Sequence, residues 1–395
     1  MDARIWERAM KRQEILLQAF NGQINWVQAA EILGISARQI RRIKKAWEKA
    51  GSPALVDKRY GGSAWNRVDD AIRNRVTQLY REQYFDFNVK HFHEKLQAEH
   101  GIKQSYNWVL WLLQESKLVA KNRMRDKHRK RRERRPLEGM MIHLDGSDHR
   151  WLGESHPKWD LLATLDDATN EVYDAFFVPE ENTVSVLQIL STTIEKRGVF
   201  CSLYTDRARH FVVTDEAGQR PSKAIRTQCQ RALDQLGIKL IAANSPQARG
   251  RGERLWRTFQ GRLPQELRLN KIKNIIEANT YLRSVFIPDY NKRFNIESKE
   301  KGSAFVPLAS LHNLNQIFSI QHERIVSSDN TISYKTKTFQ LPESSLRYSF
   351  ARCRVTIHEH LDGTYSVSFG PHSIAKYSSA LELMENQNKP KKKAA

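Results

Sequence analysis

The apolar positions in the middle of the chain come in short runs that predict buried strands. One run covers residues 140–144 and leads into Asp145, a second covers 199–204 and stops at Asp206, and a third covers 239–243. Short apolar runs bounded by turn-forming residues are typical of strands in the core of a sheet. We therefore expect Asp145 and Asp206 to lie together at the edge of a sheet, where two neighbouring strands end.

A helix is predicted after the third run, because residues 244–246 break the strand and Gly250 and Gly252 precede a helical pattern. The apolar stripe of this helix has i, i+4, i+8 spacing and consists of Leu255, Phe259 and Leu263. The opposite face carries Glu253, Arg257 and Gln260. Glu253 is thus expected in the first turn, pointing away from the core.

The surrounding pattern completes a mixed α/β order of three strands, helix, strand, helix, strand, helix. Residues 161–165 predict another strand, closed by Asp166 and Asp167, which we interpret as turn residues. Helical spacing is present in 182–197 and 222–236, and the polar stretch 214–220 predicts a surface loop. His143 and His210 flank the two aspartates, but a single histidine near a strand end is more often structural.

The N-terminal region, residues 1–50, predicts a helix-turn-helix. A short helix over 26–33 is followed by a turn and a second helix that begins at Ser36, with Gln39 three residues later as in a capping box. The outer face of the second helix is basic and is expected to contact DNA through Arg38, Arg41, Arg42 and Lys45. A plain three-helix bundle with a solvated charged face is the alternative.

A second helical unit is predicted over 66–120, with helices over 69–80, 89–99 and 105–115. His91, His93 and His100 lie in it without partner cysteines, so we place them on a helix surface, not in a zinc site. A basic linker follows over 121–137, and we expect it to neutralise DNA phosphates. Its candidate DNA contacts are Arg129, Lys130, Arg131 and Arg132.

The C-terminal texture changes to alternating segments over 332–341, 352–358 and 365–369, with a turn at Asp362 and Gly363. We predict a small β-barrel over 325–378 and a disordered basic tail over 379–395. The expected fold is therefore multidomain α+β: helical units at the N-terminus, an α/β core over 138–300 and the barrel.

Composition favours a nucleic-acid partner over a membrane. The 395 residues carry a formal charge of +21, and no apolar run reaches the length of a transmembrane helix. Residues 1–13 lack the pattern of a secretory signal, which predicts a cytoplasmic protein. The 3 cysteines are scattered, so neither a disulfide framework nor a thiolate zinc site is indicated.

Three carboxylates at the predicted sheet edge and helix start suit Mg²⁺, which prefers oxygen ligands, and a two-metal site can clamp both oxygens of a phosphodiester. Ordinary strand-end and helix-start acids are the alternative for each residue alone. The order Asp145, Asp206, Glu253, with the string S-P-Q-x-x-G-x-x-E ending at Glu253, resembles the DDE transposase and retroviral-type integrase superfamily. Tyr290, Asn291 and Arg293 resemble the Tyr-Asn-x-x-Arg segment that often follows the catalytic helix.

The resemblance covers about residues 138–295 and implies a ribonuclease-H-like core with Asp145, Asp206 and Glu253 as catalytic residues and ligands of two Mg²⁺ ions, or Mn²⁺. It implies insertion-sequence transposition, with the ISNCY group as candidate subgroup. Two departures leave the subgroup open: Arg207 and Ala208 follow the second aspartate in place of Asn-Gly, and the gap from Asp206 to Glu253 is long. No zinc module like that of retroviral integrases is expected.

By the same resemblance, the protein would bind double-stranded DNA at transposon ends and at a target, as a dimer or higher homo-oligomer near the nucleoid. Arginines around Glu253 are expected to hold DNA, namely Arg249, Arg251, Arg254 and Arg257. Two alternatives remain: a DNA-binding regulator descended from a transposase, with a silent triad, and a structure-specific nuclease of the same fold.

Overall fold

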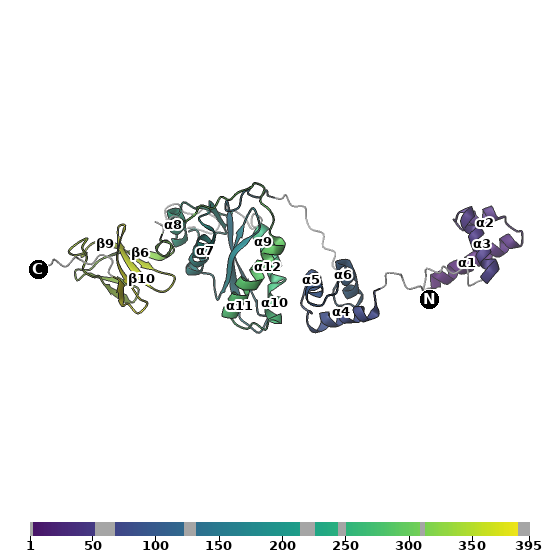
Figure 1. The fold of residues 1–395 in the computed structure, drawn as a ribbon, viewed down its shortest axis with the longest axis horizontal. Helices are drawn as coiled ribbons and strands as arrows, with labels where there is room; N and C mark the ends of the chain where they lie inside the picture. Colours follow the sequence, from purple (N-terminus) through teal and green to yellow (C-terminus); the bar gives the residue numbers. More distant parts are fainter. Residues whose placement is uncertain are drawn as a thin grey trace. The chain divides into compact units, whose positions relative to one another are not determined.

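The computed structural model describes residues 3–51, 68–121, 132–213, 226–243, 250–308 and 313–385 (Figure 1). The chain divides into two compact units, Met1–Val76 and Thr77–Ala395. Several predictions fall outside the described residues: the loop 214–220, the strand break at 244–246 and the basic tail from 386 onward. The candidate DNA contacts Arg129, Lys130, Arg131 and Arg249 lie outside them too.

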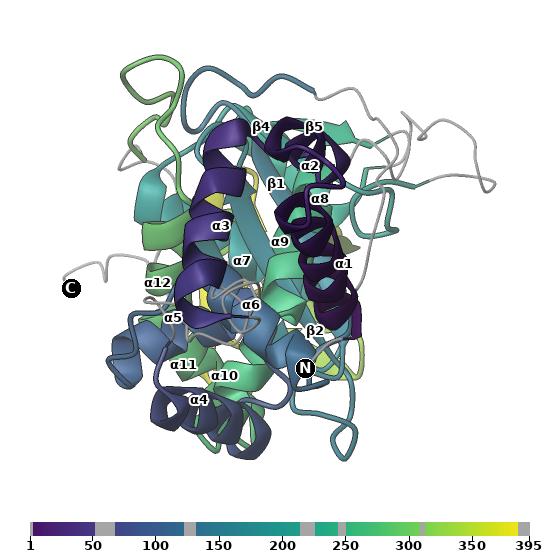
Figure 2. The ribbon, with the colours of Figure 1, turned by 90° about the vertical axis from the view of Figure 1, so that its right-hand side faces the viewer.

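The N-terminal region, residues 3–51, contains α1 (Ala3–Phe20), α2 (Trp26–Ile32) and α3 (Ala37–Ala50) (Figure 2). Leu16, Ala29 and Ile40 are at most 1% exposed and form its centre. Gly34 makes the turn between α2 and α3 at φ +63°, and the Ser36 hydroxyl accepts from the Gln39 amide. The predicted helix-turn-helix is therefore present as local structure.

A second group of helices follows, α4 (Asp70–Glu82), α5 (Val89–Glu99) and α6 (Tyr106–Glu115). Asn88 and Ser105 cap α5 and α6 by accepting from the backbone amide three residues on. Leu79, Phe92 and Leu96 are buried at the centre of the group. The three helices lie within one or two residues of the positions that the apolar spacing predicts.

The central sheet has the strand order β3-β2-β1-β4-β5. β1, β2 and β3 are antiparallel neighbours, whereas β4 runs parallel to both β1 and β5. The strands are β1 (Ile142–His149), β2 (Trp159–Asp166), β3 (Val172–Val178), β4 (Ser202–Thr205) and β5 (Lys239–Ala242). The predicted order of three strands, helix, strand, helix, strand, helix is confirmed.

Helices cover both faces of this sheet (Figure 1). One face packs against α7 (Thr183–Arg197) and α8 (Gln228–Gln235). The other packs against α9 (Gly250–Gln260), α10 (Leu263–Leu269), α11 (Ile275–Tyr281), the π-helical turn η3 (Leu282–Phe286) and α12 (Ile287–Phe294). Side chains of β2 alternate between the two cores, with Leu162 in the first and Leu161 and Ala163 in the second.

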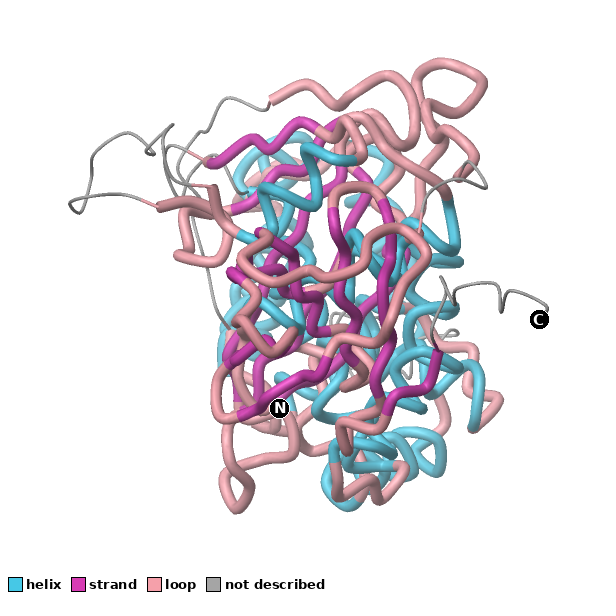
Figure 3. The backbone as a smooth tube through the Cα atoms, turned by 90° about the vertical axis from the view of Figure 1, so that its left-hand side faces the viewer, coloured by secondary structure: helices cyan, strands magenta, loops and turns pink. Residues whose placement is uncertain are grey.

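The C-terminal strands do not form the predicted closed barrel. After α13 (Leu314–Ile317), they make an antiparallel sheet of order β12-β11-β10-β9-β6 and a separate β7-β8 hairpin (Figure 3). These strands are β6 (Ile320–Ile325), β7 (Thr331–Tyr334), β8 (Lys337–Gln340), β9 (Arg354–Glu359), β10 (Tyr365–Phe369), β11 (His372–Tyr377) and β12 (Leu383–Glu385).

A shared core explains this architecture. Ile332 and Phe339 of the hairpin pack with Val355, Ile357 and Val367 of the larger sheet. The hairpin thus buries its apolar side by face-to-face packing on the larger sheet, so the pairing of edge strands that would close a barrel is not needed. The alternating pattern located β9 and β10, whereas the predicted segment 332–341 is the hairpin of β7 and β8, and the association of the strands was not predicted.

Within the described part of the chain, no helix has the length and apolar character needed to cross a membrane.

Candidate active site

Asp145 lies in the middle of β1, not at its end as the apolar run predicted. The strand continues to His149 because β2 keeps pairing with it, with Asp145 opposite Ala163. On its other edge, β1 pairs with β4 only as far as His143, which is opposite Tyr204. Asp145 therefore lies just beyond the point at which the β1–β4 pairing stops.

Asp206 directly follows β4, as predicted. It is two residues after Tyr204, just as Asp145 is two residues after His143, so the parallel register places the two aspartates at the same level of the sheet. The Asp206 carboxylate accepts from the Ala208 amide at 2.9 Å, which fixes the turn after the strand. Both aspartates are partly exposed.

Glu253 lies in the first turn of α9 and is exposed, as the helical spacing predicted. The stripe Leu255, Phe259 and Leu263 is buried, although Leu263 already belongs to α10. Gln260 shares a face of α9 with Glu253 and donates to the Ser147 hydroxyl of β1 at 3.0 Å. The last residue of α9 is therefore bonded to the strand that carries Asp145.

Gly252 shows how close this approach is. A Cβ atom at position 252 would stand 2.6 Å from Asp145 Oδ2, a separation that real Cβ atoms do not tolerate. Only glycine allows the Asp145 carboxylate to lie against the backbone of the residue that precedes Glu253. Gly250, two positions earlier, has open space around it.

Register and packing thus bring Asp145, Asp206 and the start of α9 to one end of the sheet. Among the residues that the structure describes, however, no three His, Cys, Asp or Glu side chains stand close enough together to hold a metal ion. Glu253 is the exposed member of the predicted trio, at the start of a helix. Carboxylate oxygens are suitable ligands for a hard divalent cation, but the side chains of this trio do not converge on one point in the structure.

Glu181, which the sequence pattern did not single out, lies beside Asp145. A Cβ at Gly146 would be 2.1 Å from Glu181 Oε2, so the Glu181 carboxylate covers the backbone next to Asp145. His210 Nε2 contacts Glu181 Oε1 at 2.9 Å. Gly146 was the available signal, since a glycine inside a strand often marks a close approach.

Asp167 is a buried hub and not only the turn residue predicted from sequence. Its carboxylate contacts His143 Nε2 at 2.7 Å, the Arg135 amide at 2.8 Å and the guanidinium groups of Arg132 and Arg251. Burial alone would raise the pKa of Asp167, but these partners outweigh it and lower the pKa to about 2. Asp166 does make the predicted turn by accepting from the Ala168 and Thr169 amides.

The predicted DNA contacts differ in what they do in the structure. On α3, Arg38, Arg41, Arg42 and Lys45 are all exposed. Arg132 and Arg251 instead bind Asp167, and burial lowers the pKa of Arg251 to about 10, which leaves it charged at neutral pH. On α9, Arg254 and Arg257 are exposed.

A cavity of about 270 Å³ opens beside α9, and we call it the arginine pocket. Its polar and charged lining consists of Arg134, Asn170, Arg251, Arg254, Arg257, Thr258 and Tyr290. The remaining lining residues are Leu165, Leu255 and Phe294, so the described part of the chain contributes no carboxylate to the lining. Arg134 donates to the carbonyl oxygens of Asp167 and Ala168 and to Asn170 Oδ1.

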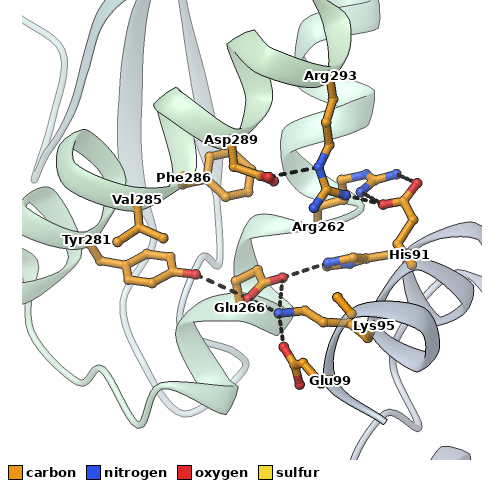
Figure 4. A pocket seen from close by; sticks show the side chains of 12 residues that line it. His91, Lys95, Glu99, Arg262, Glu266, Tyr281, Val285, Phe286, Asp289 and Arg293 are labelled. Atoms are coloured by element: carbon orange, nitrogen blue, oxygen red, sulfur yellow. Dashed lines mark hydrogen bonds and ion pairs between the residues drawn. The ribbon is translucent and has the colours of Figure 1, made fainter. Parts of the chain in front are cut away.

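A second cavity, of about 240 Å³, lies between α5 and the helices α10 to α12, and we call it the paired pocket (Figure 4). Glu266 accepts from His91 at 2.7 Å, from Lys95 at 3.0 Å and from the Tyr281 hydroxyl at 3.1 Å. Burial would raise the pKa of Glu266, but His91 and Lys95 lower it to about 2.

Arginines of the core meet a glutamate of α5 in the same cavity. Arg262 pairs with Glu94 at 2.6 Å, and Arg293 binds both Glu94 and Asp289 (Figure 4). The prediction that His91 and His93 lie on a helix surface is wrong, since both are buried. Spacing within α5 could not reveal this, because the partner Glu266 is 175 residues away in the sequence.

Tyr290, Asn291 and Arg293 form part of α12 and hold the core together, although one residue separates Asn291 from Arg293 where the Tyr-Asn-x-x-Arg pattern has two. Asn291 accepts from the Val172 amide and donates to the Val172 carbonyl, both at 2.9 Å, and so binds the edge of β3. The Tyr290 ring packs on Phe259 and Phe294. Arg293 provides the link to α5 just described.

Comparison with known proteins agrees with this architecture. A helix-turn-helix domain model matches residues 11–63. The chain is 29% identical over 369 residues to "Putative transposase y4bF" of Sinorhizobium fredii, which covers 93% of this chain and 80% of that protein. The chain is thus similar in sequence to a transposase over most of its length. It is also 28% identical over 354 residues to a transposase for insertion sequence IS1202 of Streptococcus pneumoniae, which covers 81% of this chain and 75% of that protein.

The comparison with solved structures gives two matches to integrase assemblies or domains. The simian T-cell lymphotropic virus intasome in complex with the PP2A regulatory subunit B56 gamma matches with a TM-score of 0.34 and 13% identity, over 71% of this chain and 91% of that one. The HTLV-2 integrase catalytic core with magnesium, in its trimeric form, matches with a TM-score of 0.28 and 15% identity, over 37% and 85%.

Proposed function

We propose that the protein is a DNA transposase that binds the ends of an insertion sequence and cuts and joins DNA at Asp145, Asp206 and Glu253. The observation that carries this proposal is the register of β1 and β4, which sets the two aspartates side by side while Gly252 holds the start of α9 against Asp145. The full-length relationship to transposases supports the same reaction class.

The three carboxylates would be the ligands of two Mg²⁺ ions, with Mn²⁺ as a substitute. Bound there, divalent cations would supply the charge that stabilises the phosphodiester oxygens in the transition state. Because Glu253 is exposed on the first turn of α9, its side chain can turn toward the aspartates without unpacking the Leu255 and Phe259 side of the helix. We propose that DNA completes this arrangement by ordering Glu253.

The proposed reaction has two steps of one chemistry. In the first, the oxygen of water forms a bond to phosphorus, the bond from phosphorus to the 3′ oxygen breaks, and that oxygen takes up a proton. In the second, the freed 3′-hydroxyl replaces water and attacks a phosphodiester of the target strand. The number of phosphodiester bonds is conserved in the second step, so no external energy source is needed.

DNA recognition is assigned to the basic surfaces. We propose that the exposed cations of α3 contact DNA at the element's ends, with further phosphate contacts from residues 129–132 and from Arg249, Arg251, Arg254 and Arg257. The proposed domains are those predicted from sequence: helical units over 1–50 and 66–120, a linker over 121–137 and a catalytic core over 138–300. Paired ends imply a dimer or higher homo-oligomer.

The test is strand transfer with purified full-length protein, Mg²⁺ and a labelled duplex that carries the end of the element that encodes the protein. Wild-type protein is expected to give nicked and joined products, and Glu253→Gln neither. The matched control is Asp148→Asn, because Asp148 is an exposed acid of the same strand that pairs with Lys158. Asp148→Asn should keep wild-type products.

Two other outcomes would replace the proposal. Nicking without joining would assign a nuclease, and tight binding of the ends with no metal-dependent product would assign a DNA-binding regulator. Joined products from Glu253→Gln at the wild-type rate would show that the assigned residue is not catalytic.

A further inference from the structure

The arginine pocket differs from an ordinary charged surface in its lack of counter-charge. It is lined by Arg134, Arg251, Arg254 and Arg257 and by no carboxylate of the described residues. Asp167, which does not line it, binds Arg251 and Arg132 and so offsets only part of this charge. The cavity therefore keeps an excess of positive charge that an anion can neutralise.

Two of the four arginines have unused donors. Among the described residues, the guanidinium groups of Arg254 and Arg257 make no hydrogen bond or ion pair, whereas Arg134 and Arg251 are held by the β2–β3 turn. The pocket thus combines two fixed arginines with two that can move onto a ligand. Forked guanidinium donors match the oxygens of a phosphate.

The hydroxyl of Tyr290 gives a second, independent indication. Tyr290 lines the pocket and is only 7% exposed, yet its hydroxyl makes no hydrogen bond among the described residues. Its ring is fixed between Phe259 and Phe294 at centroid distances of 5.1 and 4.9 Å. A hydroxyl that lines a basic cavity and has no partner among the described residues is available to donate to an acceptor that binds there.

The pocket lies on a different face of α9 from the assigned catalytic residue. Arg251, Arg254 and Thr258 have i, i+3, i+7 spacing and share one face, whereas Glu253 and Gln260 share another, which meets Ser147 of β1. Arg257 stands between the two faces. An anion in the pocket is thus close to the cutting site but separate from it.

We infer that the arginine pocket binds a phosphate group of the DNA backbone next to, and distinct from, the phosphate that is cut. The inference rests on the proposed function, since it assumes that DNA runs along α9. The volume of about 270 Å³ is ample for a phosphate with part of its sugar and is below the usual range of drug-sized ligands. The pocket would fix the position of the strand relative to Glu253.

The test measures DNA affinity of the full-length protein without divalent metal, across a series of sodium chloride concentrations. Each phosphate contact by an arginine contributes about one unit to the slope of log K against log salt. Arg254→Gln should therefore lower the slope by about one unit, and Arg257→Gln likewise. Lys273→Gln, an exposed cation before α11, removes the same charge elsewhere and should keep the wild-type slope.

Tyr290→Phe sharpens the assignment because it removes one oxygen and keeps the packed ring. It should weaken DNA binding about tenfold, as expected for losing a hydrogen bond to a charged acceptor, with no change of slope. Wild-type slopes in both arginine variants, together with wild-type affinity in Tyr290→Phe, would overturn the inference.

A second experiment distinguishes a phosphate of the DNA backbone from free inorganic phosphate. If inorganic phosphate raises the melting temperature of the wild type above that in chloride of equal ionic strength, but both arginine variants keep the wild-type DNA slope, the pocket binds free phosphate and our inference is wrong. Asp206→Asn separates the inference from the proposed function: it should abolish cutting and keep the wild-type slope, since the readout needs no catalysis.

Discussion

The paired pocket and the arginine pocket have similar volumes, and cationic side chains line both. They differ in whether those cations have carboxylate partners. In the paired pocket, Lys95, Arg262 and Arg293 each contact a carboxylate. In the arginine pocket, Arg254 and Arg257 contact none among the described residues. Paired charges hold two parts of the protein together, whereas unpaired arginines are available to a ligand.

The difference has an energetic reason. Desolvating a cation costs free energy that a carboxylate partner recovers, and several charge-assisted hydrogen bonds around one carboxylate recover more. Glu266 collects three such bonds and becomes an integral part of the core. Arg254 remains exposed and keeps its hydration until an anion binds, so it contributes little to the stability of the protein alone.

The largest effect is expected from removing the carboxylate of the paired pocket. Glu266→Ala leaves buried His91 without its acceptor and removes one of the two carboxylate partners of Lys95, so it should lower the free energy of unfolding by about 3–5 kcal/mol. Urea denaturation of the full-length protein measures this. A loss below about 1 kcal/mol would show that the pairing does not support the fold.

Gly252→Ala tests the contact between α9 and Asp145. A methyl group there would meet Asp145 Oδ2 at 2.6 Å and should displace the carboxylate. A displacement of about 1 Å can cost about 100-fold in rate, so we expect cutting to fall by that order with DNA affinity kept. Gly250→Ala is the matched control, because it has open space, and equal rates for the two variants would contradict the assigned position of Asp145.

Acid should reduce the contribution of Asp167 and its ion-pair partners to the stability of the fold. Its pKa in the folded protein, about 2, lies below the ordinary 3.8, so Asp167 contributes stability that is present above about pH 4 and is lost as the pH falls toward 2. The shift corresponds to about 2 kcal/mol. Denaturation curves at several pH values give the free energy of unfolding of wild type and of Asp167→Asn. The difference between these two free energies should decrease by about that amount below pH 4, whereas a constant difference would refute this role.

The smallest effect belongs to the arginine pocket in the absence of DNA. Arg254→Ala should change the free energy of unfolding by less than about 0.5 kcal/mol, because the side chain is exposed and has no ion-pair partner among the described residues. The same urea experiment measures it beside Glu266→Ala. A loss comparable to that of Glu266→Ala would abolish the contrast between the two cavities.

Local patterns predicted most of the elements, because helix and strand periodicity depends on residues close in sequence. The order of strands and helices in the core, the exposed position of Glu253 and the buried Leu255–Phe259 stripe all follow from spacing. The continuation of β1 past Asp145 does not, because β2 supplies the pairing. The open C-terminal sheets likewise depend on packing between strands that are far apart in the sequence.

The charged hubs could not be predicted for the same reason. His91 and Glu266 are 175 residues apart, and Arg251 and the Asp167 carbonyl are 84 apart, so no spacing rule connects them. Sequence reasoning therefore placed His91 on the surface and predicted a DNA contact for Arg251. It did not predict the carboxylate partner that each of them has in the protein. Gly146 and Gly252 carried a local signal of close approach, but their partners were not evident from it.

The central claim is that Asp206 serves cutting while cations serve DNA binding. One preparation each of wild type and Asp206→Asn, assayed on the same labelled end for affinity and for Mg²⁺-dependent nicking, tests it most directly. The account predicts affinities within about twofold of one another and no nicked product from Asp206→Asn, because affinity rests on Lys and Arg contacts to phosphate. Nicking by Asp206→Asn at the wild-type rate would contradict it.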